Sequence, residues 1–357
     1  MRGADLFVAG TGRRLPPAMT LDQAVADGLV ERRTVWRDGI VSVCVSDGES
    51  GPEMAVRAAR TALRVAGGHA RGVDGDPDDD VDPDDDVDLV LHANIYHQGH
   101  DLWPPASYVQ RAATSGRGPA IEVRQLSNGG MAALELAAGY LAADRTRRRA
   151  LITTGDRFAL PGIDRWRSDP GTVLADGGTA LVLSTTGGYA RLRSIVTVSD
   201  PTLEAMQRGG DPFGATPLDA RRPIDVEPAH RHFVSATGLD TVLDRLDAGG
   251  REAYKRALSE AGADADEIAW FVLPNLGLPR LREYFLGKFD IDVDRTLWSW
   301  GRNVGHLGAG DQIAGLDELA VSGRLRPGQL CLLAGVGAGF TWSCAVVEML
   351  RPLEERS

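Results

Sequence analysis

The chain has 357 residues, of which 43% are hydrophobic and 25% are charged, and its formal net charge is −11. This size and composition predict one large or two medium folded cores and argue against a disordered chain. No apolar run approaches the roughly 20 residues that cross a bilayer, and the N-terminal apolar stretch is too short for a secretory signal. We therefore expect a cytoplasmic protein with no membrane contact.

An aspartate-rich loop at residues 73–88 holds nearly all of the net charge, because ten aspartates lie between Asp74 and Asp88. The rest of the chain is close to neutral, so a nucleic-acid partner is not expected. The loop lacks the spaced ligands, turn glycine and closing glutamate of a calcium loop. This pattern favours a solvated surface loop over a cation site.

The sequence contains little that predicts a metal site. Its cysteines, Cys44, Cys331 and Cys344, lie in strand-like runs with no paired spacing, which predicts small buried side chains rather than disulfides or a zinc site. His97 and His100 would need further ligands that the surrounding sequence does not supply. We expect no metal and no resident cofactor.

In chain order, the same plan of elements occurs twice. An apolar run ends at Asn94 in the first half and at Asn275 in the second, and each is followed by a helix-length segment and then by two more strand-like runs. ALITTGD and GGTALVLS in the first half correspond to QLCLLAG and TWSCAVVEM in the second. Short continuous apolar runs with helix-length connections are typical of buried, largely parallel strands, so the pattern predicts an α/β fold.

The duplication predicts two halves related by a pseudo-two-fold axis. We place the boundary near residues 187–188, which gives an N-terminal half at 1–187, including the aspartate-rich loop, and a C-terminal half at 188–357. Segment 200–235 is rich in Pro, Gly and Arg. It is expected to be a long irregular excursion over a site.

Positions at matching spacing in the two halves carry a serine and a histidine. Ser127 begins the helical stretch SNGGMAALELAAGYLAAD, and His306 begins GHLGAGDQIAGLDELAVSG. A serine hydroxyl becomes a nucleophile when a base takes its proton, and a helix N-terminus pushes a histidine toward the neutral form that can do so. Free N–H groups at the start of the serine helix could stabilise an oxyanion. Alternatively, Ser127 is only a helix N-cap and His306 only a structural histidine.

Asp311 and the turn GVGAGF at 335–340 are candidates to complete this site. Asp311 could orient the imidazole as the third member of a Ser–His–Asp arrangement. It follows His306 by five residues, which is about 140° around an ideal helix, so the pairing requires an irregular first turn. The glycine-rich turn could offer a second oxyanion donor, which we assign to Gly339.

At these residues the sequence resembles the β-ketoacyl-acyl carrier protein synthase III group of the thiolase superfamily. The most specific match is RLRPGQLCLLAGVGAGFTWSCAVVEM, supported by DGGTALVLS and RDGI. The resemblance implies a thiolase fold, with duplicated βαβ-containing halves in a layered α/β/α/β/α arrangement, and a homodimer. It also implies acyl-CoA or an acyl carrier protein as substrate.

The positions that are catalytic in this family carry exchanged residues here. Ser127 stands where the family has a nucleophilic cysteine, Asn275 where it has a histidine, and His306 where it has an asparagine. The exchange argues against decarboxylative condensation and leaves acyl-enzyme formation and transfer chemically reasonable. The pattern is most similar to a branch in antibiotic biosynthesis, which comprises acyltransferases on hydroxyl acceptors and enzymes that load a short starter acyl group for aromatic polyketides. Within this branch, the serine nucleophile together with the histidine of GHLGAGD most resembles the starter-unit enzymes.

The resemblance also implies three substrate-binding residues. Arg37 stands where the family has an arginine that contacts the nucleotide of coenzyme A, although a surface salt bridge explains it equally well. Trp103 lies in a segment expected at the dimer interface and the pocket. Phe340 is expected in the core or the pocket wall.

We therefore expect an acyltransferase that moves a short acyl group from a CoA or carrier-protein thioester, through an ester on Ser127, to a carrier protein or to a hydroxyl of a natural product. Asn275 is expected to help hold the acyl carbonyl or the acceptor. One alternative is a priming ketosynthase that condenses its acyl group with malonyl-carrier protein. Another is a catalytically inactive thiolase-fold subunit that partners an active synthase.

Overall fold

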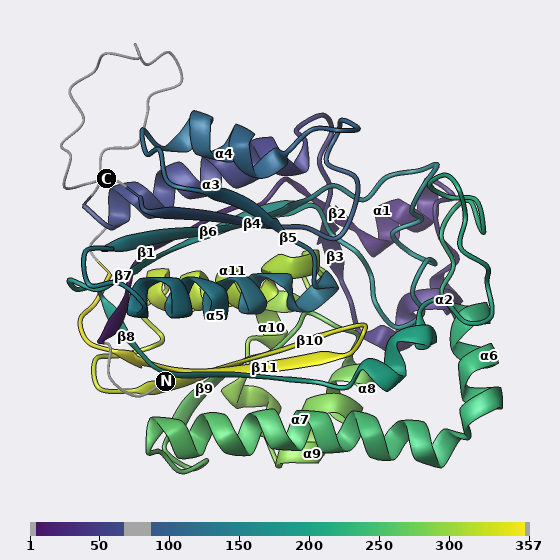
Figure 1. The fold of residues 1–357 in the computed structure, drawn as a ribbon. Helices are drawn as coiled ribbons and strands as arrows, with labels where there is room; N and C mark the ends of the chain where they lie inside the picture. Colours follow the sequence, from purple (N-terminus) through teal and green to yellow (C-terminus); the bar gives the residue numbers. More distant parts are fainter. Residues whose placement is uncertain (1–4, 68–86, 354–357) are drawn as a thin grey trace.

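Two halves of one nine-stranded sheet face each other across a pair of buried helices (Figure 1). The computed structural model describes residues 5–67 and 87–353, so nearly all of the predicted aspartate-rich loop lies outside the described residues. The strand order is β5-β4-β6-β7-β1-β8-β11-β10-β9. Strands β1 and β8 pair antiparallel at the centre of this order and join the two halves.

The first half of the sheet consists of strands from the N-terminal part of the chain. They are β1 (Leu6–Arg14), β4 (Leu89–Ala93), β5 (Ala120–Val123), β6 (Arg149–Asp156) and β7 (Gly177–Ser184). Strand β4 is parallel to β5 and β6, whereas β7 is antiparallel to β6 and β1. Helices α3 (Gly51–Val65) and α4 (Pro105–Ala113) cover its outer face, and α5 (Gly129–Ala142) covers its inner face (Figure 1).

The second half repeats this arrangement. Its strands are β8 (Ala190–Ser199), β9 (Ile268–Val272), β10 (Leu330–Gly337) and β11 (Thr341–Met349). Strand β9 is parallel to β10, and β11 is antiparallel to β10 and β8. Helices α7 (Leu239–Ala261) and α9 (Gly287–Phe289) lie on the outer face, and α11 (Asp311–Val321) lies on the inner face beside α5 (Figure 1).

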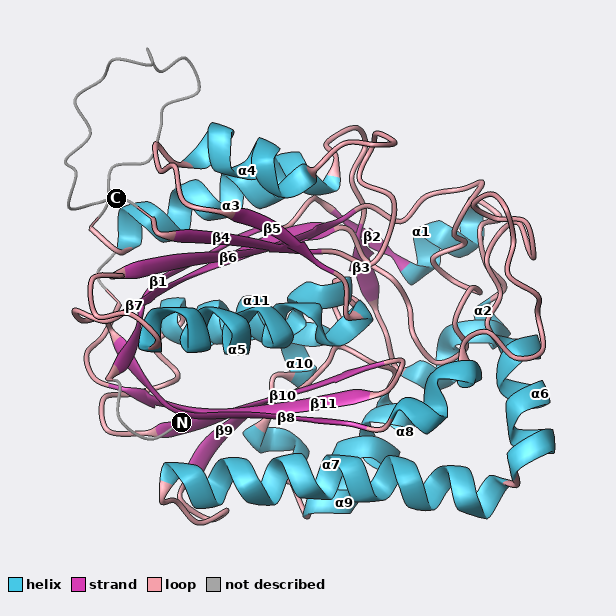
Figure 2. Cartoon of the chain, viewed as in Figure 1, coloured by secondary structure: helices cyan, strands magenta, loops and turns pink. Residues whose placement is uncertain are grey.

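The order β4-β6-β7-β1 is therefore mirrored by β9-β10-β11-β8. The strand correspondences predicted from the sequence are confirmed, as are the α/β class and the five α/β/α/β/α layers (Figure 2). Residues 187–188 lie between β7 and β8. The domain boundary placed there remains a prediction.

Shorter elements surround the open end of the layers. On the N-terminal side they are β2 (Ala18–Thr20), α1 (Leu21–Ala26), α2 (Arg32–Val35), the 3₁₀ turn η1 (Trp36–Asp38) and β3 (Ser42–Cys44). In the C-terminal half they are η4 (Pro201–Met206), α6 (Glu227–Thr237), α8 (Leu278–Leu281), the π-helical η5 (Arg282–Leu286), η6 (Val293–Arg295) and α10 (Trp298–Gly301). Within the predicted excursion, residues 207–226 are irregular as expected, whereas the last part forms α6.

The central helices α5 and α11 are buried because both halves of the sheet pack on them. Leu134 of α5 and Leu316 of α11 belong to one core cluster with Ile152 of β6 and Leu333 of β10. Burying one such leucine stabilises the fold by roughly 1.5–3 kcal/mol relative to exposure. All three cysteines are free and buried, as predicted.

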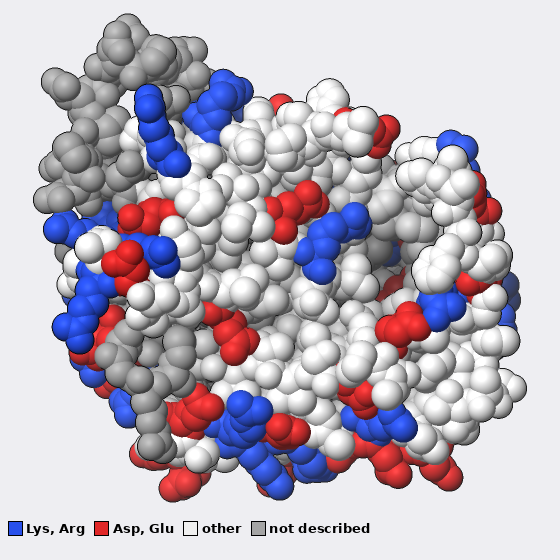
Figure 3. Space-filling view, viewed as in Figure 1, with Lys and Arg blue, Asp and Glu red and all other residues white. Residues whose placement is uncertain are grey.

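The surface offers no dominant charge of one sign on the face that Figure 3 shows, where basic and acidic side chains are interspersed. Across residues 5–67 and 87–353, no helix combines the length and the hydropathy required to span a membrane.

Candidate active site

Ser127 lies in a single 3₁₀ turn, η3 (Leu126–Asn128), directly before α5. Asn128 occupies the N-cap position of α5, and its amide donates hydrogen bonds to two hydroxyls of β11 instead of capping the helix. The Ser127 Oγ is 2.8 Å from Nε2 of His306. The alternative that Ser127 serves only as an N-cap is therefore wrong.

Two glycines allow the serine and histidine segments to meet. The 3₁₀ turn η7 (Gly308–Gly310), directly before α11, packs on the start of α5. A Cβ on Gly130 would lie 2.4 Å from the carbonyl oxygen of Ala309, and one on Gly129 would lie 3.2 Å from the Ala309 Cβ. The SNGG sequence thus lets backbone from the second half approach the serine turn closely.

His306 is held by its backbone before η7 begins. Its N–H donates to the carbonyl of Val173 at 2.9 Å, and its carbonyl accepts from the N–H of Ala175 at 2.8 Å. His306 precedes the first residue of α11 by five residues, whereas Ser127 precedes that of α5 by two. The two residues meet, but the prediction that they occupy equivalent positions is wrong, because Ser127 lies within the 3₁₀ turn before its helix, whereas His306 lies two residues before the corresponding turn.

The predicted irregular turn brings Asp311 to His306. Since η7 separates His306 from α11, the imidazole folds back onto the first helical residue, and Nδ1 of His306 lies 2.5 Å from Oδ2 of Asp311. The same carboxylate accepts the backbone N–H of Leu307 and that of Asn275, both at 2.8 Å. These donors fix the orientation of the carboxylate toward the imidazole.

These contacts define the protonation pattern of His306. An ionised carboxylate can only accept, so Nδ1 carries a proton toward Asp311, and Nε2 is left to accept the Ser127 hydroxyl. Burial lowers the pKa of His306, but the charge and hydrogen bond of Asp311, with weaker help from Asp169 and Asp156, raise it above its ordinary value overall. This direction is opposite to the one predicted from the helix N-terminus, because the carboxylate in direct contact outweighs the effect of burial on the pKa of His306.

Asn275 contacts the carboxylate rather than the cavity. Its Nδ2 donates to the carbonyl of Gly305 at 3.0 Å and to Oδ1 of Asp311 at 3.3 Å. Both amide hydrogens are therefore directed to protein groups. Asn275 is not among the residues that line the cavity, and its contact with an acyl carbonyl or acceptor remains a prediction.

The glycine-rich turn lies beside the serine turn. Gly339 is in the turn between β10 and β11, and a Cβ on Gly337 at the end of β10 would lie 2.8 Å from the backbone nitrogen of Asn128. Phe340, from the same turn, lines the cavity next to Ser127, as expected for a wall residue. The oxyanion-hole roles of Ser127 and Gly339 remain predictions.

A cavity of about 360 Å³ opens at Ser127 and His306, which is within the usual size range of ligand sites. One wall is apolar and consists of Ile95, Tyr96, Phe158, Ile163, Leu174 and Ile224. The other end is polar and is lined by Ser168, Asp169, Thr172, Gln207, His230, Arg280 and Tyr284. Gln207 and His230 belong to segment 200–235. The prediction that this segment lies over a site is confirmed to the extent that it lines the cavity.

Two predicted substrate-binding residues lie outside the lining of this cavity. Arg37 is exposed in η1. Trp103 is half-buried and its ring packs near His100 and Tyr108, with centroid distances of 5.3 and 5.6 Å. Contacts of Arg37 with a nucleotide and of Trp103 across a dimer interface remain predictions.

The structure also reveals polar residues that the sequence reasoning missed. Asp156 ends β6 and accepts hydrogen bonds from the backbone N–H groups of Ile95 and Tyr96; burial raises its pKa to about 7, although these hydrogen bonds oppose the rise. Asp156 could have been identified from the sequence, because it ends the predicted strand ALITTGD beside the strand that ends at Asn94. Arg280 forms a two-point ion pair with Asp169 at 3.0 Å, for which the sequence carried no signal because the partners are far apart in the chain.

Comparison with known proteins points to one family. The profile described as 3-oxoacyl-[acyl-carrier-protein (ACP)] synthase III matches residues 121–201, and its C-terminal counterpart matches residues 258–349. A β-ketoacyl-[acyl-carrier-protein] synthase III from Hyphomonas neptunium is 26% identical over 358 residues, covering 97% of this chain and 100% of that relative.

Solved structures agree with these matches. ChlB3, described as an acyltransferase, is 34% identical with a TM-score of 0.88, and the match covers 98% of this chain and 99% of that chain. The 3-oxoacyl-(acyl carrier protein) synthase III, FabH, from Pseudomonas aeruginosa PAO1 has a TM-score of 0.73 at 20% identity, covers 98% of this chain and 100% of that chain, and shares the fold.

Proposed function

Because the chain belongs to the FabH-like ketosynthase III family of thiolase-fold proteins, we propose that it is an acyltransferase that works through an ester on Ser127. The observation that carries this proposal is the continuous hydrogen-bonded series Ser127–His306–Asp311 at the wall of a cavity. A nucleophile, a base and a group that orients the base are the parts that acyl transfer needs.

In the first half-reaction, Nε2 of His306 takes the Ser127 proton while Oγ attacks the carbonyl carbon of an acyl thioester. The backbone N–H groups of Ser127 and Gly339 donate to the developing oxyanion, each contributing about 3 kcal/mol. The C–S bond then breaks, and His306 returns the proton to the departing thiolate. The products are a free thiol and an acyl ester on Ser127.

In the second half-reaction, His306 takes a proton from the acceptor, whose oxygen or sulfur attacks the ester carbonyl. The C–O bond to Ser127 breaks and the serine regains its proton from His306. Asp311 stabilises the imidazolium in both halves and keeps Nε2 directed at Ser127. Asn275 acts as a positioning residue for Asp311.

Transfer fits these residues better than decarboxylative condensation. At Asn275, where the family has a histidine, no donor is left for an enolate, because both amide hydrogens are directed at Gly305 and Asp311. The description of ChlB3 as an acyltransferase supports the same reading. A paired serine, histidine and aspartate also argue against an inactive partner subunit.

Membership of the family supports a proposal for the substrates. We propose a short acyl group on coenzyme A or an acyl carrier protein as donor, a carrier protein or natural-product hydroxyl as acceptor, and a role in polyketide or antibiotic biosynthesis. We further propose a homodimer in which Trp103 lies at the interface, and contact between Arg37 and the donor's nucleotide.

The test measures both halves of the reaction with acetyl-, propionyl- and butyryl-CoA and their carrier-protein thioesters. The proposal predicts release of one thiol per protein before acceptor is added, followed by acyl transfer. Carbon dioxide released from malonyl-carrier protein in step with product would instead establish the priming ketosynthase. Absence of thiol release with every donor would contradict both and favour the inactive subunit.

A further inference from the structure

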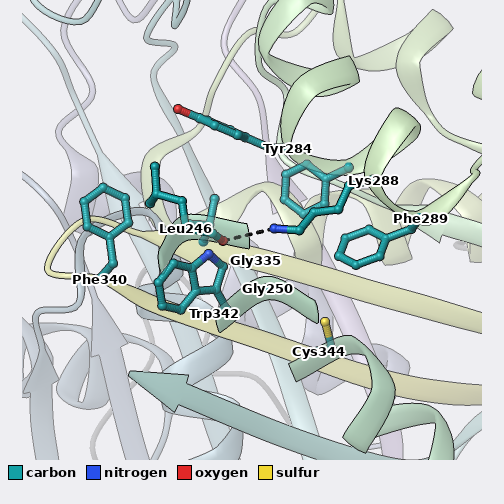
Figure 4. A pocket seen from close by; sticks show the side chains of 11 residues that line it. Leu246, Gly250, Tyr284, Lys288, Phe289, Gly335, Phe340, Trp342 and Cys344 are labelled. Carbon is teal, nitrogen blue, oxygen red and sulfur yellow. Dashed lines mark hydrogen bonds between the residues drawn. The ribbon is translucent and has the colours of Figure 1, made fainter. Parts of the chain in front are cut away.

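A second, smaller cavity lies directly behind the wall of the first. It measures about 30 Å³, and we call it the inner cavity (Figure 4). Tyr284, Val336 and Phe340 line both cavities. The remaining walls are mostly apolar and include Phe289 and Trp342. The inner cavity is therefore separated from the Ser127 site by side chains that the two spaces share.

Two backbone features create this space. A Cβ on Gly250 of α7 would lie 2.9 Å from Nζ of Lys288 and 3.6 Å from the Trp342 ring. Tyr284 lies in the π-helical segment η5, and π-helical turns occur often at functional sites. The space thus depends on a missing side chain on one helix and on an irregular turn opposite it.

Lys288 places a buried cation in these apolar surroundings. Its side chain is only 8% exposed, and it is one of two lysines in the chain. The ammonium donates to the carbonyl of Leu246 at 3.0 Å (Figure 4) and lies 3.3 Å from a carboxylate oxygen of Asp247. Burial lowers the pKa of Lys288, and Asp247 only partly offsets this.

The described residues supply two oxygen acceptors, from Leu246 and Asp247, for an ammonium that has three N–H donors, and the Phe289 ring centroid lies 5.7 Å from Nζ. A buried donor without a partner costs roughly 1–3 kcal/mol, so an acceptor inside the inner cavity would be stabilised there. The nonpolar walls suit a small group, and an oxygen atom on that group would accept a hydrogen bond from the Lys288 ammonium. Neither feature is used by the Ser127–His306–Asp311 series.

Building on the proposed function, we propose that the inner cavity receives the far end of the acyl group carried by Ser127 and that Lys288 donates a hydrogen bond to an oxygen at that end. Rotation of the half-buried Phe340 ring would join the two cavities. The acyl donors of this protein are then short thioesters with a terminal hydroxyl, keto or carboxylate oxygen, in preference to plain alkanoyl thioesters.

The test compares acylation rates of Ser127 with matched CoA thioesters. 4-Hydroxybutyryl-CoA is paired with butyryl-CoA, 4-oxopentanoyl-CoA with pentanoyl-CoA, and succinyl-CoA serves as the carboxylate arm. In the wild type we expect at least one oxygenated donor to react about 10-fold faster than its alkanoyl control. Lys288→Met should bring that ratio close to one, whereas Lys255→Met, at an exposed position on the same protein, should preserve it.

Gly250→Ala provides a second variant, because its Cβ would press on the Lys288 ammonium; it should slow the oxygenated donors while acetyl-CoA reacts normally. Equal rates for every pair in the wild type, or a preference that survives Lys288→Met, would overturn the inference while leaving the proposed function intact. Failure of all donors, acetyl-CoA included, would refute the proposed function and the inference with it.

Discussion

The two copies of the repeat use the same local design for different purposes. In the first copy, Nδ2 of Asn94, the residue that follows β4, donates to Glu122 at 2.8 Å. In the second copy, Nδ2 of Asn275, three residues after β9, donates to Asp311. Glu122 is exposed on β5, whereas Asp311 is buried at the start of α11 and contacts His306.

The difference lies in what each copy places before its central helix. In the first, a 3₁₀ turn carries Ser127 itself. In the second, the turn η7 carries only glycine and alanine, and His306 stands before it. One copy therefore supplies the hydroxyl, and the other supplies the imidazole and the carboxylate. A duplicated frame can thus divide a catalytic site between its halves.

Removing the hydroxyl of Ser127 should have the largest effect on activity of all the variants considered. Ser127→Ala should lower acyl transfer by about 10⁴-fold or more, because the nucleophile is lost. The free energy of unfolding should change by no more than about 1 kcal/mol, since Ser127 caps no helix. Steady-state transfer assays and thermal melts measure both quantities.

Two further variants control this result. Ser107→Ala, on the exposed side of α4, should retain full activity. Ser127→Cys should still form an acyl-enzyme, since a thiolate is intrinsically more nucleophilic. Full transfer activity in Ser127→Ala would show that the first copy does not supply the nucleophile.

Next in size is the effect of neutralising the carboxylate of the second copy. Asp311→Asn should reduce the maximal acylation rate by about 10³–10⁴-fold, because the imidazole loses its correct tautomer. Wild-type acylation should fall as the pH drops through the raised pKa of His306, since the base must be neutral to accept a proton.

The same variant should move that acid limb to lower pH, because the negative charge that raises the His306 pKa is gone. Single-turnover rates between pH 5 and 9 test both effects. An acid limb at the same pH in both proteins would mean that Asp311 does not govern the protonation of His306.

A smaller effect separates the two asparagines. Asn275→Ala should lower the acylation rate by about 10–100-fold, the range typical of residues that orient a functional group. Asn94→Ala removes a bond to a glutamate outside the site, so acylation should stay within about 2-fold of the wild-type rate. Single-turnover kinetics measure the acylation rates of both variants. An equal loss of rate in the two would contradict a functional distinction between the copies.

The smallest effect concerns stability. Gly130→Ala should cost about 1–3 kcal/mol, because its Cβ would clash with the carbonyl of Ala309. Gly139→Ala, in the same helix with open space around it, should stabilise by about 0.5–1 kcal/mol. Denaturant unfolding measures both, and a neutral Gly130→Ala would show that the contact between the two turns is looser than described.

Much of the architecture could be predicted from the sequence because buried parallel strands leave continuous apolar runs. The runs that end at Asn94 and Asn275 became β4 and β9, and the glycine-rich stretch 335–340 became the end of β10 and the turn to β11. Matching spacings in the two halves then predicted the mirrored strand order. These signals are local, or repeat at a fixed interval, and are therefore visible in a single chain.

The parts that the sequence did not predict depend on contacts between distant segments. Spacing alone set His306 at a position equivalent to Ser127, because it does not reveal where each 3₁₀ turn begins: Ser127 lies within η3, whereas His306 lies two residues before η7. The direction of the His306 pKa depends on Asp311 folding back onto the ring. Likewise, the sequence does not reveal the acceptors of the Asn275 amide group, because Gly305 and Asp311 are far from it in the chain.

The proposed function requires that the hydroxyl of the first copy carries the acyl group. Its most direct test is a fragment mass spectrum of the protein quenched after reaction with a short acyl thioester. We predict one acyl group per chain, located on Ser127 as an oxygen ester and missing when His306 is replaced by glutamine. An acyl group found on Cys44, Cys331 or Cys344, or no stable adduct from any donor, would contradict the claim.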